Sequence, residues 1–178
     1  MDLARSEWPK NVSGLSLSTK PLTLVMFLHP KCECSDASLN ELLYIMKGSE
    51  KRLEAQIDIY FPQKKNVEWA HGALWEKATA LPGTSLIPDK GGRIAYLFGA
   101  RTSGETYLFN SNGRLLFHGG ITESRGHIGE SPGRRAIASI VSGKKPDATI
   151  THPFGCALFS AGEYAALGKL LRPAGGVN

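Results

Sequence analysis

Two cysteines, Cys32 and Cys34, stand between an apolar segment and the start of a predicted helix. Residues 22–28 are apolar and numerous enough for a buried strand. The helix is indicated by apolar residues at helical spacing, namely Leu39, Leu42, Leu43 and Met46. Because a helix N-terminus offers unpaired N–H groups and a positive dipole end, it favours a thiolate over a thiol. A thiolate attacks disulfides, reduces oxidants or binds metal. The position therefore predicts redox or metal chemistry, against the alternative of two partly buried small residues.

A third cysteine, Cys156, lies in the apolar and glycine-containing segment 154–158. Three cysteines in 178 residues are too few for a disulfide scaffold, which favours a chemical role over a structural one. Two interpretations of Cys156 stay open. It is either a buried small residue that holds the tail against the sheet, or a third thiol that reaches Cys32 or Cys34 and accepts their disulfide.

Length and composition predict one globular domain. We expect an N-terminal extension over residues 1–20, a core domain over 21–143 and a tail over 144–178 that packs on the domain and contains Cys156. The net charge of +5 is dispersed, which argues against a nucleic-acid partner. No stretch is apolar enough for a membrane span or a signal peptide, so the sequence by itself predicts a cytoplasmic location and leaves the oligomeric state open.

The order of predicted elements indicates an α/β protein with a mixed sheet covered by helices on both faces. A helix after the cysteines and a strand over residues 53–61 complete a βαβ unit, which requires parallel strands. A hairpin is predicted around Asn112-Gly113, a strong turn signal. The remaining expectations are a helix over 67–81, a short strand over 84–87, a turn over 88–92, a short helix over 94–98, a helix over 134–141 and a short helix within 161–171.

This order, with a cysteine pair after the first core strand, resembles the thioredoxin-like fold, a three-layer α/β/α sandwich around a central mixed sheet. Three segments are similar to the bacterial thioredoxin-like group called RedB: HPKCECSDASLNEL, FGARTSGETYLFNSNGRLLFHGGITESRGH and HPFGCALF. The resemblance runs from about Trp8 to Phe159. Many members of that group look membrane-anchored with the domain outside the cytoplasm. The resemblance thus implies a cell-envelope or periplasmic location as the alternative, if an anchor is missing from this chain.

The first functional hypothesis is a thiol–disulfide oxidoreductase that acts on a protein or small-molecule thiol or disulfide and needs no cofactor. We expect Cys32 to be the more exposed nucleophile and Cys34 to resolve the mixed disulfide. Thioredoxins use Cys-x-x-Cys and a facing cis-proline, whereas this chain has one residue fewer between its cysteines and Gly104 at about the proline position. Because a disulfide across one residue closes a small, strained ring, we expect a relatively oxidising couple.

Two alternatives remain. Thiolate and imidazole ligands suit copper or zinc, and His29, Cys32 and Cys34 lie within six residues of one another. This would make the protein a metallochaperone of the kind that Sco-type thioredoxin-like proteins represent, although the histidine that those proteins place before the hairpin is missing. The segment FGARTSGETYLFNSNG also resembles peroxiredoxins, but the threonine of their Pro-x-x-x-Thr-x-x-Cys loop is absent.

Several further residues are candidates for tuning the thiols or lining a substrate groove. A positive neighbour lowers a thiol pKa, which draws attention to His29 and Lys31, although Lys31 can equally be a solvated loop charge. The polar loop over residues 119–127 follows the hairpin and can either line a groove or form a turn shaped by its glycines. The groove candidates are Thr102, Ser103, Gly104, Arg125 and His127.

Overall fold

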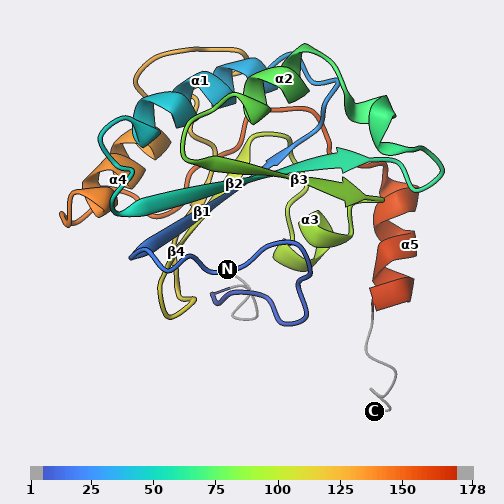
Figure 1. The fold of residues 1–178 in the computed structure, drawn as a ribbon, viewed down its shortest axis with the longest axis horizontal. Helices are drawn as coiled ribbons and strands as arrows, with labels where there is room; N and C mark the ends of the chain where they lie inside the picture. Colours follow the sequence, from blue (N-terminus) through green and yellow to red (C-terminus); the bar gives the residue numbers. More distant parts are fainter. Residues whose placement is uncertain (1–5, 172–178) are drawn as a thin grey trace.

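The computed structural model describes residues 6–171 and contains a five-stranded mixed sheet in the order β3-β2-β1-β4-β5 (Figure 1). The central strand β1 (Leu22–Leu28) is parallel to β2 (Leu53–Phe61) and antiparallel to β4 (Glu105–Asn110). The edge strands are β3 (Thr84–Lys90), parallel to β2, and β5 (Leu115–Gly119), antiparallel to β4. The predicted mixed sheet is thus confirmed, and its parallel part contains the βαβ unit that leads into and out of the cysteines.

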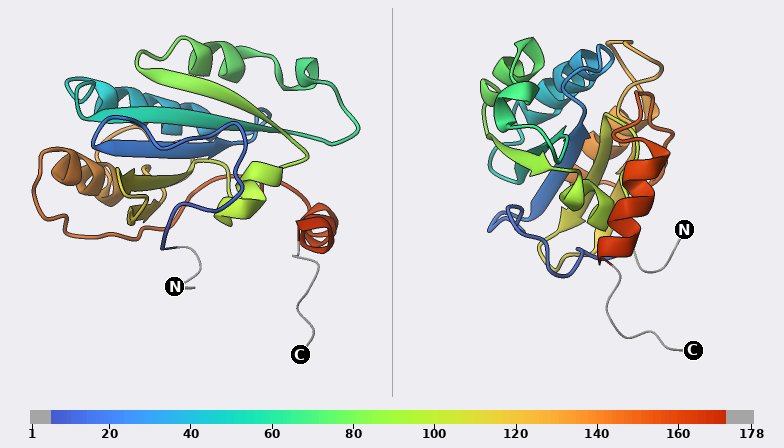
Figure 2. Two further views of the ribbon diagram at one scale, coloured as in Figure 1. Left: turned by 60° about the horizontal axis from the view of Figure 1, so that its bottom comes forward. Right: turned by 90° about the vertical axis from the view of Figure 1, so that its right-hand side faces the viewer.

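Helices cover both faces of the sheet (Figures 1 and 2). One face packs against α1 (Ser35–Met46), α2 (Ala73–Thr79) and α4 (Pro132–Val141), whose apolar side chains join one core cluster. The other face packs against α3 (Arg93–Phe98) and α5 (Ala161–Leu171), which join a second cluster. The two clusters follow from the alternation of side chains along β1 and β2, which sends successive residues to opposite faces.

Local structure departs from the sequence-based prediction in two places. The predicted helix over 67–81 is divided into a 3-10 helix (Val67–Ala70) and α2, because Gly72 adopts a φ of 145° that a helix does not contain. The strand predicted over 84–87 continues to Lys90, where a turn was expected. Pro88 is accepted within β3 because β3 is an edge strand and can lack one N–H donor.

The segment that follows α4 returns along the sheet before it forms α5 (Figure 2). It first lies beside β5, where the His118 N–H donates to the Thr149 carbonyl and the Thr151 N–H donates to the His118 carbonyl. The Thr151 hydroxyl then donates to the Gly120 carbonyl at 2.7 Å. These bonds carry the chain toward the end of the sheet at which β1 meets α1. No helix within residues 6–171 is both long and apolar enough to cross a membrane.

The face of the sheet under α3 buries polar side chains of β2 that alternate with the apolar residues Ala55, Ile57 and Ile59. Gln56 is bonded through its side chain to the backbone of Ser16 in the N-terminal extension. Asp58 is also buried, and among the described residues neither of its carboxyl oxygens has a hydrogen-bond partner. Trp8 of the same extension packs edge-on against Phe98 and Phe109. The extension is therefore part of the layer that covers this face.

Candidate redox site

Cys32 lies in the turn that joins β1 to α1. The Cys32 N–H donates to the His29 carbonyl, and the Ser35 N–H donates to the Cys32 carbonyl, each at 3.0 Å. Cys34 occupies the N-cap position of α1 with φ −64° and ψ −21°. The placement of both cysteines at the start of the helix agrees with the prediction.

The relative exposure of the two cysteines is the reverse of the prediction. Cys32 is buried, with 3% of its surface exposed, whereas Cys34 is partly exposed. The reason lies far along the chain, because the segment around Cys156 crosses over Cys32. The Cys156 N–H donates to the Cys32 Sγ at 3.4 Å.

The segment around Cys156 is held by backbone pairing with the loop that precedes β4. The Ser103 N–H donates to the Cys156 carbonyl at 2.8 Å, and the Leu158 N–H donates to the Arg101 carbonyl at 2.8 Å. Thr102 and Ala157 form an antiparallel bridge between these bonds. This isolated β-bridge and its two flanking hydrogen bonds hold the segment beside residues 101–103 and fix Cys156 next to Cys32.

The environment of Cys32 favours its thiolate. Burial acts to raise its pKa, but hydrogen bonds from the Cys156 thiol, the Ser35 hydroxyl and the backbone N–H groups of Cys156 and Cys34 outweigh burial and lower the pKa from 9.0 to about 7. The Cys156 pKa is raised, chiefly because its thiol donates to Cys32. Of this pair, Cys32 is thus the thiol that ionises first as the pH rises, and Cys156 is the thiol that keeps its proton.

The hydroxyl groups of Ser35 and Ser103 form a hydrogen-bonded chain that ends at the Cys32 sulfur. The His29 N–H donates to the Ser103 Oγ at 2.7 Å, and the Ser103 and Ser35 hydroxyls are 2.6 Å apart. Since Ser35 also donates to Cys32, Ser103 must donate to Ser35 for every hydroxyl hydrogen to be used. Every hydrogen bond of the chain is then donated in the direction of the Cys32 sulfur. Hydrogen bonds that are linked in this way polarise and strengthen one another. Ser35 was missed by the sequence reasoning because its hydroxyl acts only through this tertiary arrangement.

Gly104 follows Ser103 in the chain and stands at about the position where the resemblance places a cis-proline. Its φ is 89°, its N–H donates to the Phe27 carbonyl at 2.7 Å, and an added Cβ would lie 2.6 Å from the Ser38 Oγ. A side chain at this position would therefore collide with α1.

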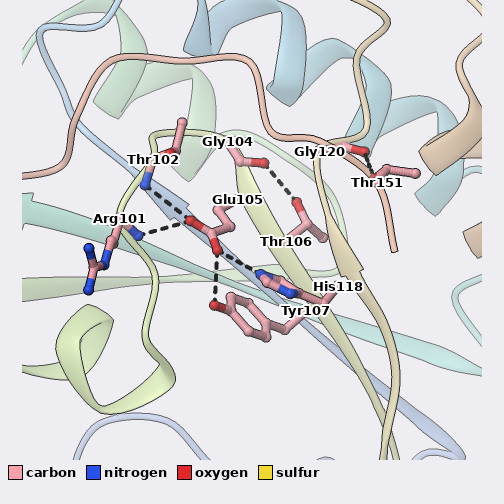
Figure 3. A network of polar contacts seen from close by, with 9 residues as sticks. All are labelled: Arg101, Thr102, Gly104, Glu105, Thr106, Tyr107, His118, Gly120 and Thr151. Atoms are coloured by element: carbon pink, nitrogen blue, oxygen red, sulfur yellow. Dashed lines mark hydrogen bonds and ion pairs between the residues drawn. The ribbon is translucent and has the colours of Figure 1, made fainter. Parts of the chain in front are cut away.

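A buried carboxylate, Glu105, fixes the loop that holds the Cys156 segment (Figure 3). One of its oxygens accepts the N–H groups of Arg101 and Thr102, at 2.9 and 3.1 Å. The other accepts the Tyr107 hydroxyl at 3.1 Å and lies 2.6 Å from the His118 Nε2. Burial acts to raise the Glu105 pKa, but the bonds from His118 and the backbone outweigh burial and lower it. Glu105 was also missed from the sequence, where it is merely the first residue of a strand.

We expect Glu105→Gln to destabilise the fold by about 2 kcal/mol at neutral pH, because an amide replaces a charge that accepts four hydrogen bonds. A folded-state pKa below the unfolded value contributes stability above the unfolded pKa, and this stability is lost as the pH falls through the folded pKa. The difference between wild type and variant should therefore shrink as the pH is lowered below 4. Thermal unfolding from pH 3 to 8 measures it, and an equal difference at every pH would contradict the role of the charge.

His29, Lys31, Arg125 and His127 are the remaining residues that the sequence suggested for tuning the thiols or lining a groove. His29 stacks on Tyr60, and its pKa is lowered, chiefly by burial. Lys31 lies over the Trp69 ring with its Nζ 5.4 Å from the ring centre. Arg125 is close enough for its charge to act on the Cys156 pKa, which it lowers. His127 is exposed and has contacts with its own loop through Ser124.

A hollow of about 280 Å³ lies between the loop after β5 and the segment that leads to Cys156. Its walls include Thr122 and Glu123 from the loop and His152 and Phe154 from the segment. Its lining contains none of the cysteines and neither Arg125 nor His127, so a substrate groove formed by the 119–127 loop beside the thiols stays a prediction. Between Ser6 and Leu171, no three histidine, cysteine, aspartate or glutamate side chains are grouped so that they could hold a metal ion.

Comparisons with known proteins give a match only at the level of structure. No model of a known protein family matches the chain, and no curated protein does either. An uncharacterized conserved protein from Geobacillus kaustophilus superposes with a TM-score of 0.62 at 16% identity, over 82% of this chain and 80% of that one. A thioredoxin-like protein solved in its oxidized form gives 0.57 at 12% identity, over 80% and 99% of the two chains. The exposed lipoprotein thioredoxin of Streptococcus pneumoniae gives 0.50 at 16% identity, over 69% and 84%.

The fold is therefore thioredoxin-like, as the order of elements and the position of the cysteines predicted. At these identities the structural likeness establishes the fold alone.

Proposed function

We propose that this protein is a thiol–disulfide oxidoreductase in which Cys32 is the attacking thiol. The observation that carries the proposal is the thiolate environment of Cys32, whose pKa is lowered to about 7 by four hydrogen bonds from Cys156, Ser35 and Cys34. A thiol with a pKa near the ambient pH combines a large thiolate fraction with high intrinsic nucleophilicity. A thioredoxin-like fold with thiols at the start of its first core helix also supports the proposal.

The reaction begins when the Cys32 thiolate attacks one sulfur of a substrate disulfide. A bond forms between Cys32 and that sulfur, the substrate disulfide breaks, and the other sulfur leaves as a thiolate that takes a proton from solvent. A second thiol of this chain then attacks Cys32, releases the remaining substrate thiolate and leaves an intramolecular disulfide. Two electrons pass to the substrate, and the reverse sequence oxidises a dithiol substrate. Neither direction requires a cofactor.

Alkylation of reduced protein with iodoacetamide tests the attacking thiol, because only the thiolate reacts. We expect the rate of Cys32 modification, followed by mass spectrometry, to rise with pH about a midpoint near 7, whereas an ordinary thiol has its midpoint near 9.0. Cys32→Ser should reduce disulfide exchange to the uncatalysed rate. The matched control is Cys34→Ser, which keeps the Cys32 thiolate. A Cys32 midpoint above 8.5, or full exchange activity in Cys32→Ser, would refute the proposal.

A further inference from the structure

Cys32 has two candidate partners for the intramolecular disulfide, Cys34 and Cys156. Cys34 is the partner that the sequence suggests, because it is only two positions away. Cys156 is 124 positions away from Cys32 in the sequence and next to it in space. The choice depends on the direction in which each side chain points and on which thiol can reach the Cys32 sulfur.

The backbone that carries Cys32 and Cys34 forms a helical turn. The Ser35 N–H bonds to the Cys32 carbonyl and the Asp36 N–H bonds to the Glu33 carbonyl, which are the bonds of a helical turn. Cys34 itself has helical backbone angles. Residues two positions apart in a helical turn do not face each other. A disulfide between these cysteines would therefore require the first turn of α1 to unwind, since disulfide geometry tolerates little deviation.

Cys156 lies directly against the Cys32 sulfur. Its N–H is 3.4 Å from the Cys32 sulfur, and its thiol donates a hydrogen bond to the same sulfur. Its position is fixed on both sides, by the bond from the Ser103 N–H to its own carbonyl and by the bond from the Leu158 N–H to the Arg101 carbonyl. Gly155 is packed so tightly that an added Cβ would lie 1.9 Å from the Ser103 carbonyl oxygen. The segment is thus seated closely on the site.

We infer that Cys156, and not Cys34, is the resolving cysteine of this oxidoreductase, so that the redox-active disulfide joins Cys32 to the C-terminal segment. The inference rests on the proposed function of Cys32. In the resolving step the Cys156 thiol loses its proton to solvent and attacks the Cys32 sulfur. The bond from Cys32 to the substrate sulfur breaks, and the substrate leaves as a thiolate.

The order of the two attacks follows from the charges. While Cys32 is a thiolate, its charge and its hydrogen bond keep the proton on Cys156. When Cys32 enters a mixed disulfide, that negative charge and that hydrogen bond disappear. Burial and the Cys34 charge still act to raise the Cys156 pKa, and the Arg125 charge acts to lower it. Cys156 consequently becomes easier to ionise at the step in which it is needed. Cys34 stays outside both steps.

The test is to oxidise the reduced full-length chain with oxidised glutathione, block free thiols with N-ethylmaleimide in acid, and map the products by proteolysis and mass spectrometry. In the wild type we expect a Cys32–Cys156 disulfide and a blocked Cys34. Cys34→Ser should form the same disulfide at the wild-type rate. Cys156→Ser should stop at the mixed disulfide between Cys32 and glutathione, with its resolution slowed at least a hundredfold.

Serine at position 156 keeps the backbone N–H and a hydroxyl donor, so the Cys32 alkylation midpoint serves as a control that the site is intact. Cys156→Ala, which keeps the N–H alone, is a second variant with the same expected product. A Cys32–Cys34 disulfide in the wild type, or normal resolution in Cys156→Ser, would overturn the inference and leave the proposed function standing. Equal glutathionylation of Cys32→Ser at the remaining cysteines would instead refute the proposed function.

Discussion

Substitution of Gly155 by alanine should raise the Cys32 pKa from about 7 toward its ordinary value of 9.0. The new Cβ would lie 1.9 Å from the Ser103 carbonyl oxygen, a distance that no Cβ contact tolerates. Because the obstacle is backbone, the segment that contains Cys156 has to move away. Its N–H and thiol would then no longer donate to Cys32, which removes two of the four hydrogen bonds that lower the Cys32 pKa.

The pH profile of Cys32 alkylation measures this effect. At pH 7, a midpoint shifted by about 1.5 units corresponds to a thiolate fraction that is lower by roughly a factor of ten or more. We also expect a loss of about 1–3 kcal/mol in stability, because overpacking carries a cost of this size. The matched control is Gly162→Ala in α5, where the nearest atom to the added Cβ is the Ser160 Oγ at 4.0 Å. A midpoint that stays near 7 in Gly155→Ala would show that the segment does not set the Cys32 pKa.

Asp58→Asn should stabilise the protein at neutral and alkaline pH. The Asp58 carboxyl is buried without a hydrogen-bond partner among the described residues, and its pKa is raised well above the ordinary value, first by burial and then by the nearby charge of Asp89. The Asp89 carboxyl oxygens do not pair with Asp58, since they accept the N–H groups of Ile94 and Ala95 at the start of α3. The ionised form of Asp58 is therefore the unfavourable one in the folded state.

The direction of the pH dependence follows from the raised pKa. The folded state holds the Asp58 proton more tightly than the unfolded chain, so stability falls as the pH rises from the unfolded pKa through the folded pKa. An uncharged amide of the same shape avoids this loss. Because an ionised buried carboxyl costs several kcal/mol, we expect a gain on the order of 2 kcal/mol or more at pH 8, or about 5 °C in Tm.

Thermal unfolding of wild type and Asp58→Asn from pH 4 to 9 tests this expectation. The advantage of the variant should grow with pH across that range. Asp147→Asn provides the control, because Asp147 is exposed and its substitution should leave the pH dependence unchanged. If the two stability curves run parallel from pH 4 to 9, Asp58 does not ionise in the folded protein in the way proposed.

The elements that position the cysteines could be predicted because their signals are local. The apolar run of β1, the helical spacing in α1 and the Asn112-Gly113 turn each determine structure within a few residues. The hairpin turn contains a positive φ of 77° at Gly113, as the glycine indicated. The length of β3 was underestimated, because an edge position, which makes Pro88 acceptable, is a property of the whole sheet.

The environment of the thiols could not be predicted in the same way. The expectation that Cys32 is exposed was wrong, because its cover comes from a segment more than one hundred positions away, and nothing in the local pattern reports that contact. The burial of Asp58 was hidden for a related reason. A strand with alternating apolar residues looks half-exposed until α3 and the N-terminal extension cover its other face. The residue type alone made Cys156 a candidate for a third thiol, but the sequence did not show that it lies next to Cys32.

The covering segment also determines when the chain acquires its reactivity during folding. Donors at Cys156 help to make Cys32 a thiolate, and these two residues meet only after a loop of 124 positions has closed. The segment pairs with residues 101–103 and with β5, so the surface that receives it exists only when these parts of the chain are arranged. A chain in which the segment is not seated lacks the Cys156 donors, and its Cys32 pKa lies closer to the ordinary value of 9.0. The alkylation midpoint of Cys32 is consequently a chemical marker of whether the two ends of this long loop have met.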